Sequence, residues 1–147
     1  MRNYPSSYKK VWTIEEIKHL LKTNAEMVWR SVLYIHYGSL TANTSLTDTG
    51  SGFAGDWWSD NDYQFGRACA EQLKKDGWLD TVYTARMAKI LSLGYVDTIC
   101  VGTNCHPRFN RVKFFKELTD HYSINFDYNG IETVSASLTE TMKHFDD

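Results

Sequence analysis

The sequence predicts a single α+β domain that is mostly helical, with four N-terminal helices, a small antiparallel β-hairpin and a C-terminal helix. Apolar residues recur at helical spacing through the first two thirds of the chain, and each such stretch follows a helix-capping residue. Later, Asn129-Gly130 separates two segments of alternating polarity, which is a strong hairpin signal. A length of 147 residues suits one domain, 1–147, with a helical part over 1–98 and a hairpin-containing part over 99–147 packed on it.

Helix-start signals place two helices near the N-terminus. Thr13 opens a Thr-x-x-Glu capping box, in which the hydroxyl accepts an orphan amide and the carboxylate reaches back, and a helix is expected over 14–22. Asn24 is a good N-cap for a second helix, expected over 25–37 and ended by Gly38. This second helix is apolar over much of its circumference, so we expect it to be central.

Two further helices are predicted in the middle of the chain. Ser59 or Asp60 caps a third helix, which Gly77 ends. Asp80 caps a fourth helix, which extends to about Leu93. The residues expected on its inner face are Val82, Ala85, Met87, Ile90 and Leu91.

The loop before the third helix and the C-terminal third are less regular. Residues 39–58 show no periodicity, and loops of this length are often functional. The glycines within 50–53, however, are best interpreted as structural, because they allow a tight backbone path that places Phe53 in the core. A short strand is expected over 99–102. The hairpin strands are expected over 122–128 and 131–136. After them, a second capping box, Ser137-Leu138-Thr139-Glu140, is expected to open a short terminal helix.

Composition narrows the functional classes. The formal net charge of -2 argues against a protein whose affinity depends on neutralising many phosphates. Five Trp, nine Tyr and seven Phe are more rings than a small core hides easily, so some are expected at a binding surface. Three cysteines fit a reducing compartment better than a disulfide framework, and the sequence has neither a long apolar run nor a signal-peptide pattern. We expect a soluble, cytoplasmic protein.

The central part of the chain resembles a small module of bacteriophage and mobile-element proteins. The resemblance covers about residues 17–97 and depends on Thr49-Gly50-Ser51-Gly52-Phe53, Ala85-Arg86 and Lys89-Ile90. Members of that family have a helix, a Thr-rich loop ending in Asn-Gly-x-Gly-Phe, and two helices with an Ala-Arg-Lys pattern. The sequence also looks similar to segments at the edge of some helicase-like proteins. The resemblance implies phage origin and an association with nucleic-acid metabolism or host interaction, and it implies no reaction.

The strongest candidate for partner binding is Asp56-Trp57-Trp58, in the loop before the third helix. Tryptophans dominate protein interfaces, and two adjacent ones in a loop are rarely both buried. We expect one ring inside the core and the other at or near a contact surface. The three residues are therefore predicted to bind a protein partner.

A basic and aromatic segment offers an alternative, a direct single-stranded nucleic-acid surface. On such a surface, basic side chains hold the phosphates, while neighbouring aromatic rings stack on the nucleotide bases. The segment also suits a half-buried element with a solvated basic face. Its basic residues are Arg108, Arg111, Lys113 and Lys116.

Metal chemistry is the third possibility. Cys100, Cys105 and His106 could form part of a zinc site, but their spacing fits neither a ribbon nor a finger. The acids Asp60 and Asp62, with Asp48 and Asp56 before them, could hold magnesium for hydrolysis. Acids at a helix start also complement the helix dipole, so neither group is assigned as a metal site.

The sequence thus favours a non-catalytic, phage-type binding protein that acts on host or phage nucleic-acid machinery. One concrete form is an inhibitor of a bacterial defence complex, similar to anti-CRISPR proteins. No enzyme activity, cofactor or metal is expected, and the partner is expected to be a protein. A single-stranded nucleic-acid-binding protein and a metal-dependent hydrolase stay open as alternatives.

Overall fold

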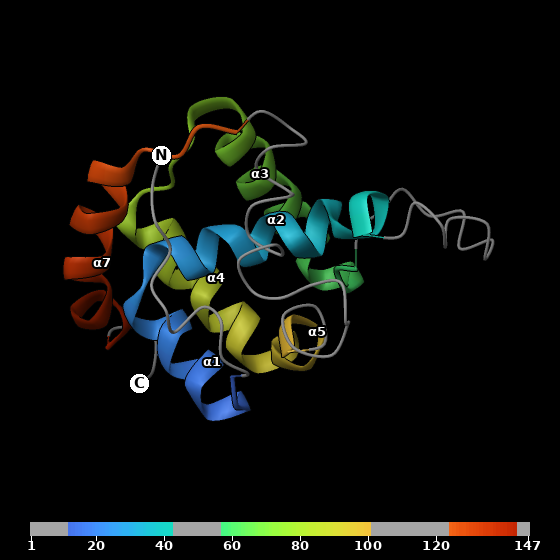
Figure 1. Ribbon diagram of the computed structural model, residues 1–147, viewed down its shortest axis with the longest axis horizontal. Helices are drawn as coiled ribbons and strands as arrows, with labels where there is room; N and C mark the ends of the chain where they lie inside the picture. The colour runs from blue at the N-terminus through green and yellow to red at the C-terminus, as the bar shows by residue number, and fades with distance from the viewer. Residues whose placement is uncertain (1–11, 43–56, 101–123, 144–147) are drawn as a thin grey trace.

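The computed structural model describes residues 12–42, 57–100 and 124–143 (Figure 1). Within these ranges the chain forms helices and no strand. The helices are α1 (Ile14–Thr23), α2 (Ala25–Ala42), α3 (Asp60–Asp76), α4 (Thr81–Gly94), α5 (Val96–Cys100) and α7 (Tyr128–Met142).

The predicted β-hairpin is wrong, because its turn and its returning strand belong to helix α7. The carboxylate of Asp127 accepts a 2.9 Å hydrogen bond from the amide of Gly130, so Asp127 is the N-cap and Asn129-Gly130 lies in the first helical turn. The residues that α7 buries recur at helical spacing: Ile131, Val134, Leu138 and Met142. Over the described ranges the fold is therefore mostly α and not α+β.

Two smaller expectations in the C-terminal third are also corrected. Ser137 does not open a terminal helix, because it lies inside α7, where its hydroxyl donates to the carbonyl oxygen of Thr133 at 3.3 Å. Residues 99 and 100 were predicted to begin a strand, but they end the short helix α5. The other half of that predicted strand, residues 101 and 102, lies outside the described residues, as do residues 122 and 123 of the first hairpin strand.

The helices predicted in the first two thirds of the chain are confirmed. Thr13 and Glu16 form the full capping box of α1, with both reciprocal hydrogen bonds present. Asp80 caps α4 through a 2.7 Å hydrogen bond from the amide of Tyr83. Gly77 ends α3 with a φ of 75°, the left-handed conformation that favours glycine. Helix α2, however, continues past Gly38 to Ala42.

Helix α2 is the central element, as its apolar circumference predicts. It crosses the middle of the view in Figure 1 and contacts α1, α3, α4, α5 and α7. Trp29 is fully buried in it, and its indole nitrogen donates a 3.0 Å hydrogen bond to the hydroxyl of Thr84 on α4. This bond satisfies two buried polar groups at once and fixes which face of α4 lies against the core.

Candidate protein-interaction surface

Trp58 is the member of the tryptophan pair that lies inside the core. It is 8% exposed, and its indole nitrogen donates a 3.0 Å hydrogen bond to Nδ1 of His36 on α2. Its ring also meets the ring of Tyr95 edge to face, with centroids 5.2 Å apart. Because its polar group is satisfied internally and its ring is enclosed, Trp58 has a structural role.

Trp57, the residue before Trp58, is half-buried. Its ring packs edge to face on Tyr34 at 5.0 Å, and its amide donates to the carbonyl oxygen of Ile35 at 2.9 Å. Asp56 lies outside the described residues. Partner binding by Asp56, Trp57 and Trp58 stays a prediction, and of the two described residues only Trp57 has a ring partly open to solvent.

The acids near the start of α3 serve the local structure. Asp62 accepts hydrogen bonds from the Tyr95 hydroxyl at 2.8 Å and the Ser59 hydroxyl at 3.0 Å. Asp60 and Asp62 both stand in the first turn of α3, where a negative charge complements the helix dipole. Asp48 and Asp56 lie outside the described residues. In the described ranges, no group of three or more His, Cys, Asp or Glu residues is arranged to hold a metal ion.

The other predicted sites fall largely outside the described ranges. Cys100 is half-buried at the end of α5, whereas Cys105 and His106 are not among the described residues. The basic segment also lies outside them, so nucleic-acid binding there stays a prediction. Its residues are Arg108, Arg111, Lys113 and Lys116.

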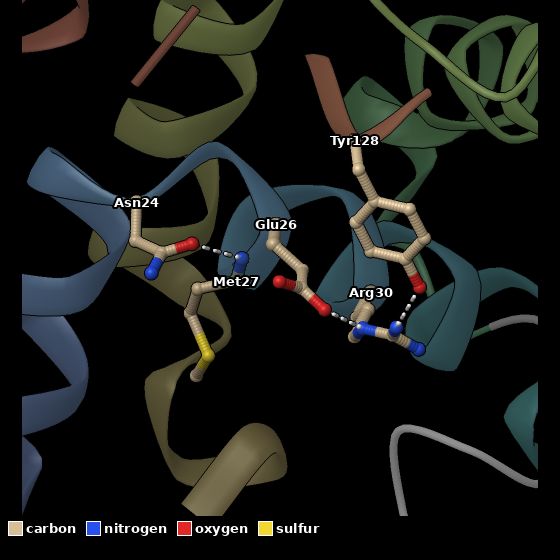
Figure 2. Close-up of polar contacts among 5 residues, drawn as sticks. All are labelled: Asn24, Glu26, Met27, Arg30 and Tyr128. Atoms are coloured by element: carbon tan, nitrogen blue, oxygen red, sulfur yellow. Dashed lines mark hydrogen bonds and ion pairs between the residues drawn. The ribbon is translucent and has the colours of Figure 1, made fainter. Parts of the chain in front are cut away.

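A buried ion pair that the sequence analysis missed lies on α2. Arg30 and Glu26 are 2% and 1% exposed, and Arg30 Nε donates to Glu26 Oε2 at 2.8 Å (Figure 2). The guanidinium also donates to the Tyr128 hydroxyl at 3.4 Å and lies over the ring of Phe126, 4.7 Å from its centroid. The pair thus connects α2 to the start of α7. The spacing of four residues between an acid and a base was its only signal in the sequence.

Helix α4 presents large side chains to solvent along the face opposite the core. Val82 is 56% exposed and Leu93 is 79% exposed, and Arg86 is exposed between them. These residues are separated by four and seven positions, so they form one line along the helix. Val82 was predicted to face inward, and that prediction is wrong. The buried face consists of Thr84, Ala85, Met87, Ala88 and Leu91.

An aromatic and arginine cluster extends this surface toward α3. The rings of Phe65 and Tyr83 meet edge to face at 5.6 Å, which joins α3 to α4. The guanidinium carbon of Arg86 lies 4.1 Å from the centroid of the Phe65 ring. Tyr83 is 49% exposed, and Phe65 is half-buried. We call Val82, Tyr83, Arg86 and Leu93 together with Phe65 the α4 surface.

The sequence contained a signal for the α4 surface. Thr81–Gly94 has more apolar residues than one helical stripe can hold, and Val82 and Leu93 are eleven positions apart, which is three turns. Two apolar residues on one side and five small or apolar ones on the other cannot all face a single core. Apolar side chains that the core leaves out are candidates for contact with a partner.

The chain was compared with known proteins. No protein-family model matches it, and neither a curated protein nor a solved structure matches it. None of the helices in the described ranges combines the length and apolar character needed to cross a bilayer.

Proposed function

We propose that this protein is a non-catalytic binding module that attaches to a protein partner through the α4 surface. The observation that carries the proposal is the exposure of Val82 and Leu93 on one line of a helix whose opposite face is fully packed. A helix that buries one face and keeps an apolar line on the other is typical of a surface that a partner covers.

The composition of the α4 surface also supports this proposal. Tyr and Arg are enriched among the residues that contribute most to binding at protein interfaces. Both are present here, and their positions are constrained, because Tyr83 and Arg86 each contact the ring of Phe65. Side chains that are already ordered lose less conformational entropy on binding.

The kind of partner is a further part of the proposal and depends on the resemblance over residues 17–97. That stretch includes α3 and α4, which together form the α4 surface. The resemblance supports a phage-type protein that acts on nucleic-acid machinery in the cytoplasm of a bacterial host. Its concrete form is an inhibitor of a host defence complex, similar to anti-CRISPR proteins.

The proposal is tested by adding charge to the α4 surface. Val82→Glu with Leu93→Glu places two carboxylates on the apolar line, and Thr133→Glu with Thr139→Glu adds the same charge at exposed positions of α7. A partner recovered with the wild type from a bacterial host is purified, and its affinity for each variant is measured by calorimetry. We expect the α4 variant to bind at least about a hundredfold more weakly, and the α7 variant to bind like the wild type.

Equal affinity of the α4 variant and the wild type would refute the proposed surface. Both variants are first checked by circular dichroism and thermal unfolding. All four positions are exposed, so each variant should unfold within a few degrees of the wild type.

A further inference from the structure

The α4 surface has a charge pattern that specifies the chemistry of what covers it. Helix α4 contains two bases, Arg86 and Lys89, and no acidic residue. The neighbouring base on α3, Arg67, is paired with Glu71 at 2.9 Å on its own helix. In the ranges that the structure describes, Arg86 by contrast has no carboxylate partner.

The geometry of Arg86 leaves its hydrogen-bond donors available. Its guanidinium lies over the ring of Phe65, 4.1 Å from the centroid. A guanidinium stacked on a ring uses its face, and the N–H groups at its edge still point away from the ring. These N–H groups can donate to the two oxygens of a carboxylate, which makes a stacked arginine a good binding partner for an acidic side chain.

The apolar side chains on either side of Arg86 exclude a purely polar ligand. Val82 stands four residues before Arg86 and Leu93 seven residues after it, so the line from Val82 to Leu93 is roughly 16 Å long at 1.5 Å per residue. Neither aliphatic side chain can pair with a phosphate or stack on a base as nucleic-acid recognition requires. Both can bury their surface against apolar side chains of a protein.

We infer that the α4 surface binds an amphipathic helix of a protein partner in which an acidic residue lies between apolar residues. The acid pairs with Arg86, and the apolar residues on either side of it cover Val82 and Leu93. The line on α4 corresponds to about three helical turns, so the complementary segment is a helix of similar length. This inference rests on the proposed function and adds to it the chemistry of the partner.

The test uses synthetic helical peptides of 18 residues with leucine at every third or fourth position and glutamate between them. A matched peptide carries glutamine in place of each glutamate, and binding of both is followed by fluorescence anisotropy. We expect the glutamate peptide to bind roughly tenfold more tightly, because an ion pair with Arg86 replaces a hydrogen bond from Arg86 to a neutral amide. Arg86→Gln should abolish that difference and leave the affinity of the glutamine peptide unchanged.

Arg67→Gln is the matched control, because Arg67 is also exposed but is already paired with Glu71. It should preserve the tenfold preference for glutamate. A preference that survives Arg86→Gln, or equal binding of the two peptides to the wild type, would overturn the inference. A single-stranded oligonucleotide that displaces the glutamate peptide would also overturn it, in favour of nucleic acid.

The failure of this inference is distinguishable from failure of the proposed function. If the peptides bind equally but Val82→Glu with Leu93→Glu still loses the natural partner, only the acidic preference is wrong. If neither peptide binds but that variant still loses the natural partner, the inference of an amphipathic-helix partner is wrong and the proposed surface stands. If that variant keeps the natural partner, the proposed surface itself is wrong.

Discussion

The ring of Trp58 lies directly against the backbone of Gly66. A Cβ atom at Gly66 would come within 2.3 Å of Cε2 of Trp58, closer than any stable contact. Gly66 is in the interior of α3, where glycine ordinarily costs stability relative to alanine. The close approach of the indole explains why the helix has glycine at this position. The packing of α3 against the core therefore depends on where the ring of Trp58 lies.

Replacing Gly66 with alanine is therefore expected to destabilise the fold. The new methyl group must displace the ring of Trp58, which is enclosed and hydrogen-bonded to His36. Overpacking of this kind typically costs about 1–3 kcal/mol, which outweighs the gain in helix propensity. Urea unfolding followed by circular dichroism measures the change in the free energy of unfolding.

The matched control is Gly94→Ala, at the last residue of α4. A Cβ atom there would meet no heavy atom within 4 Å. The free energy of unfolding should stay the same or rise by up to about 1 kcal/mol, as helix propensity predicts. If Gly66→Ala were as well tolerated as this control, the packing of Trp58 against α3 would be wrong.

The buried ion pair on α2 and an exposed ion pair on α3 have the same spacing of four residues. They should differ strongly in what they contribute to the free energy of unfolding. Arg30→Met removes the base that lies 2.8 Å from the buried Glu26 carboxylate, and breaking a buried pair in this way typically costs about 3–5 kcal/mol. Arg67→Met removes a pair whose two side chains are 55% and 54% exposed, so solvent already screens the pair and the loss of stability should be far smaller. Chemical unfolding of the two variants gives both losses, and equal losses would contradict the burial of the Arg30–Glu26 pair.

The burial of a thiol and a phenol, both of which can lose a proton, predicts that the free energy of unfolding falls at alkaline pH. Desolvation raises the pKa of the Cys69 thiol from 9.0 to about 12 and that of the Tyr34 hydroxyl from 10.0 to about 12. The folded state keeps these protons where the unfolded state releases them. The contribution of these two protonated groups to the free energy of unfolding is therefore complete below about pH 9, and it falls as the pH rises toward 12.

The measurement is the free energy of unfolding in urea at a series of pH values between 8 and 11. Cys69→Ala should lower stability at pH 8 but flatten the decline above pH 9, because the thiol no longer titrates. An unchanged slope in this variant would show that Cys69 does not contribute to the alkaline loss.

The sequence predicted the helices whose signals are local. Thr13, Asp80 and Gly77 each cap or end a helix through a contact with residues three or four positions away. The hairpin prediction failed because Asn129-Gly130 is a strong turn signal only when the flanking segments pair as strands. Here Asp127 caps a helix immediately before this dipeptide, and the helical spacing of the following apolar residues outweighs their alternation.

The surface of α4 was harder to predict because the sequence does not say which apolar face a core covers. Val82 and Ala85 both fit an inward stripe, and the choice between them depends on where Trp29 of α2 meets Thr84. That contact is between residues far apart in the sequence. The burial of Trp58 likewise depends on His36 and Gly66, which come from two other elements.

The most direct test of the central claim is site-specific photo-crosslinking of the protein in its host cell. A photoreactive phenylalanine analogue is placed at Leu93, at Val82 or, as a control, at Thr139 on α7, all of which are exposed. We predict one discrete protein adduct from positions 82 and 93, unchanged by nuclease treatment, and no adduct from position 139. The absence of an adduct from both α4 positions, the same adduct from position 139, or an adduct that nuclease removes would contradict a protein-binding surface on α4.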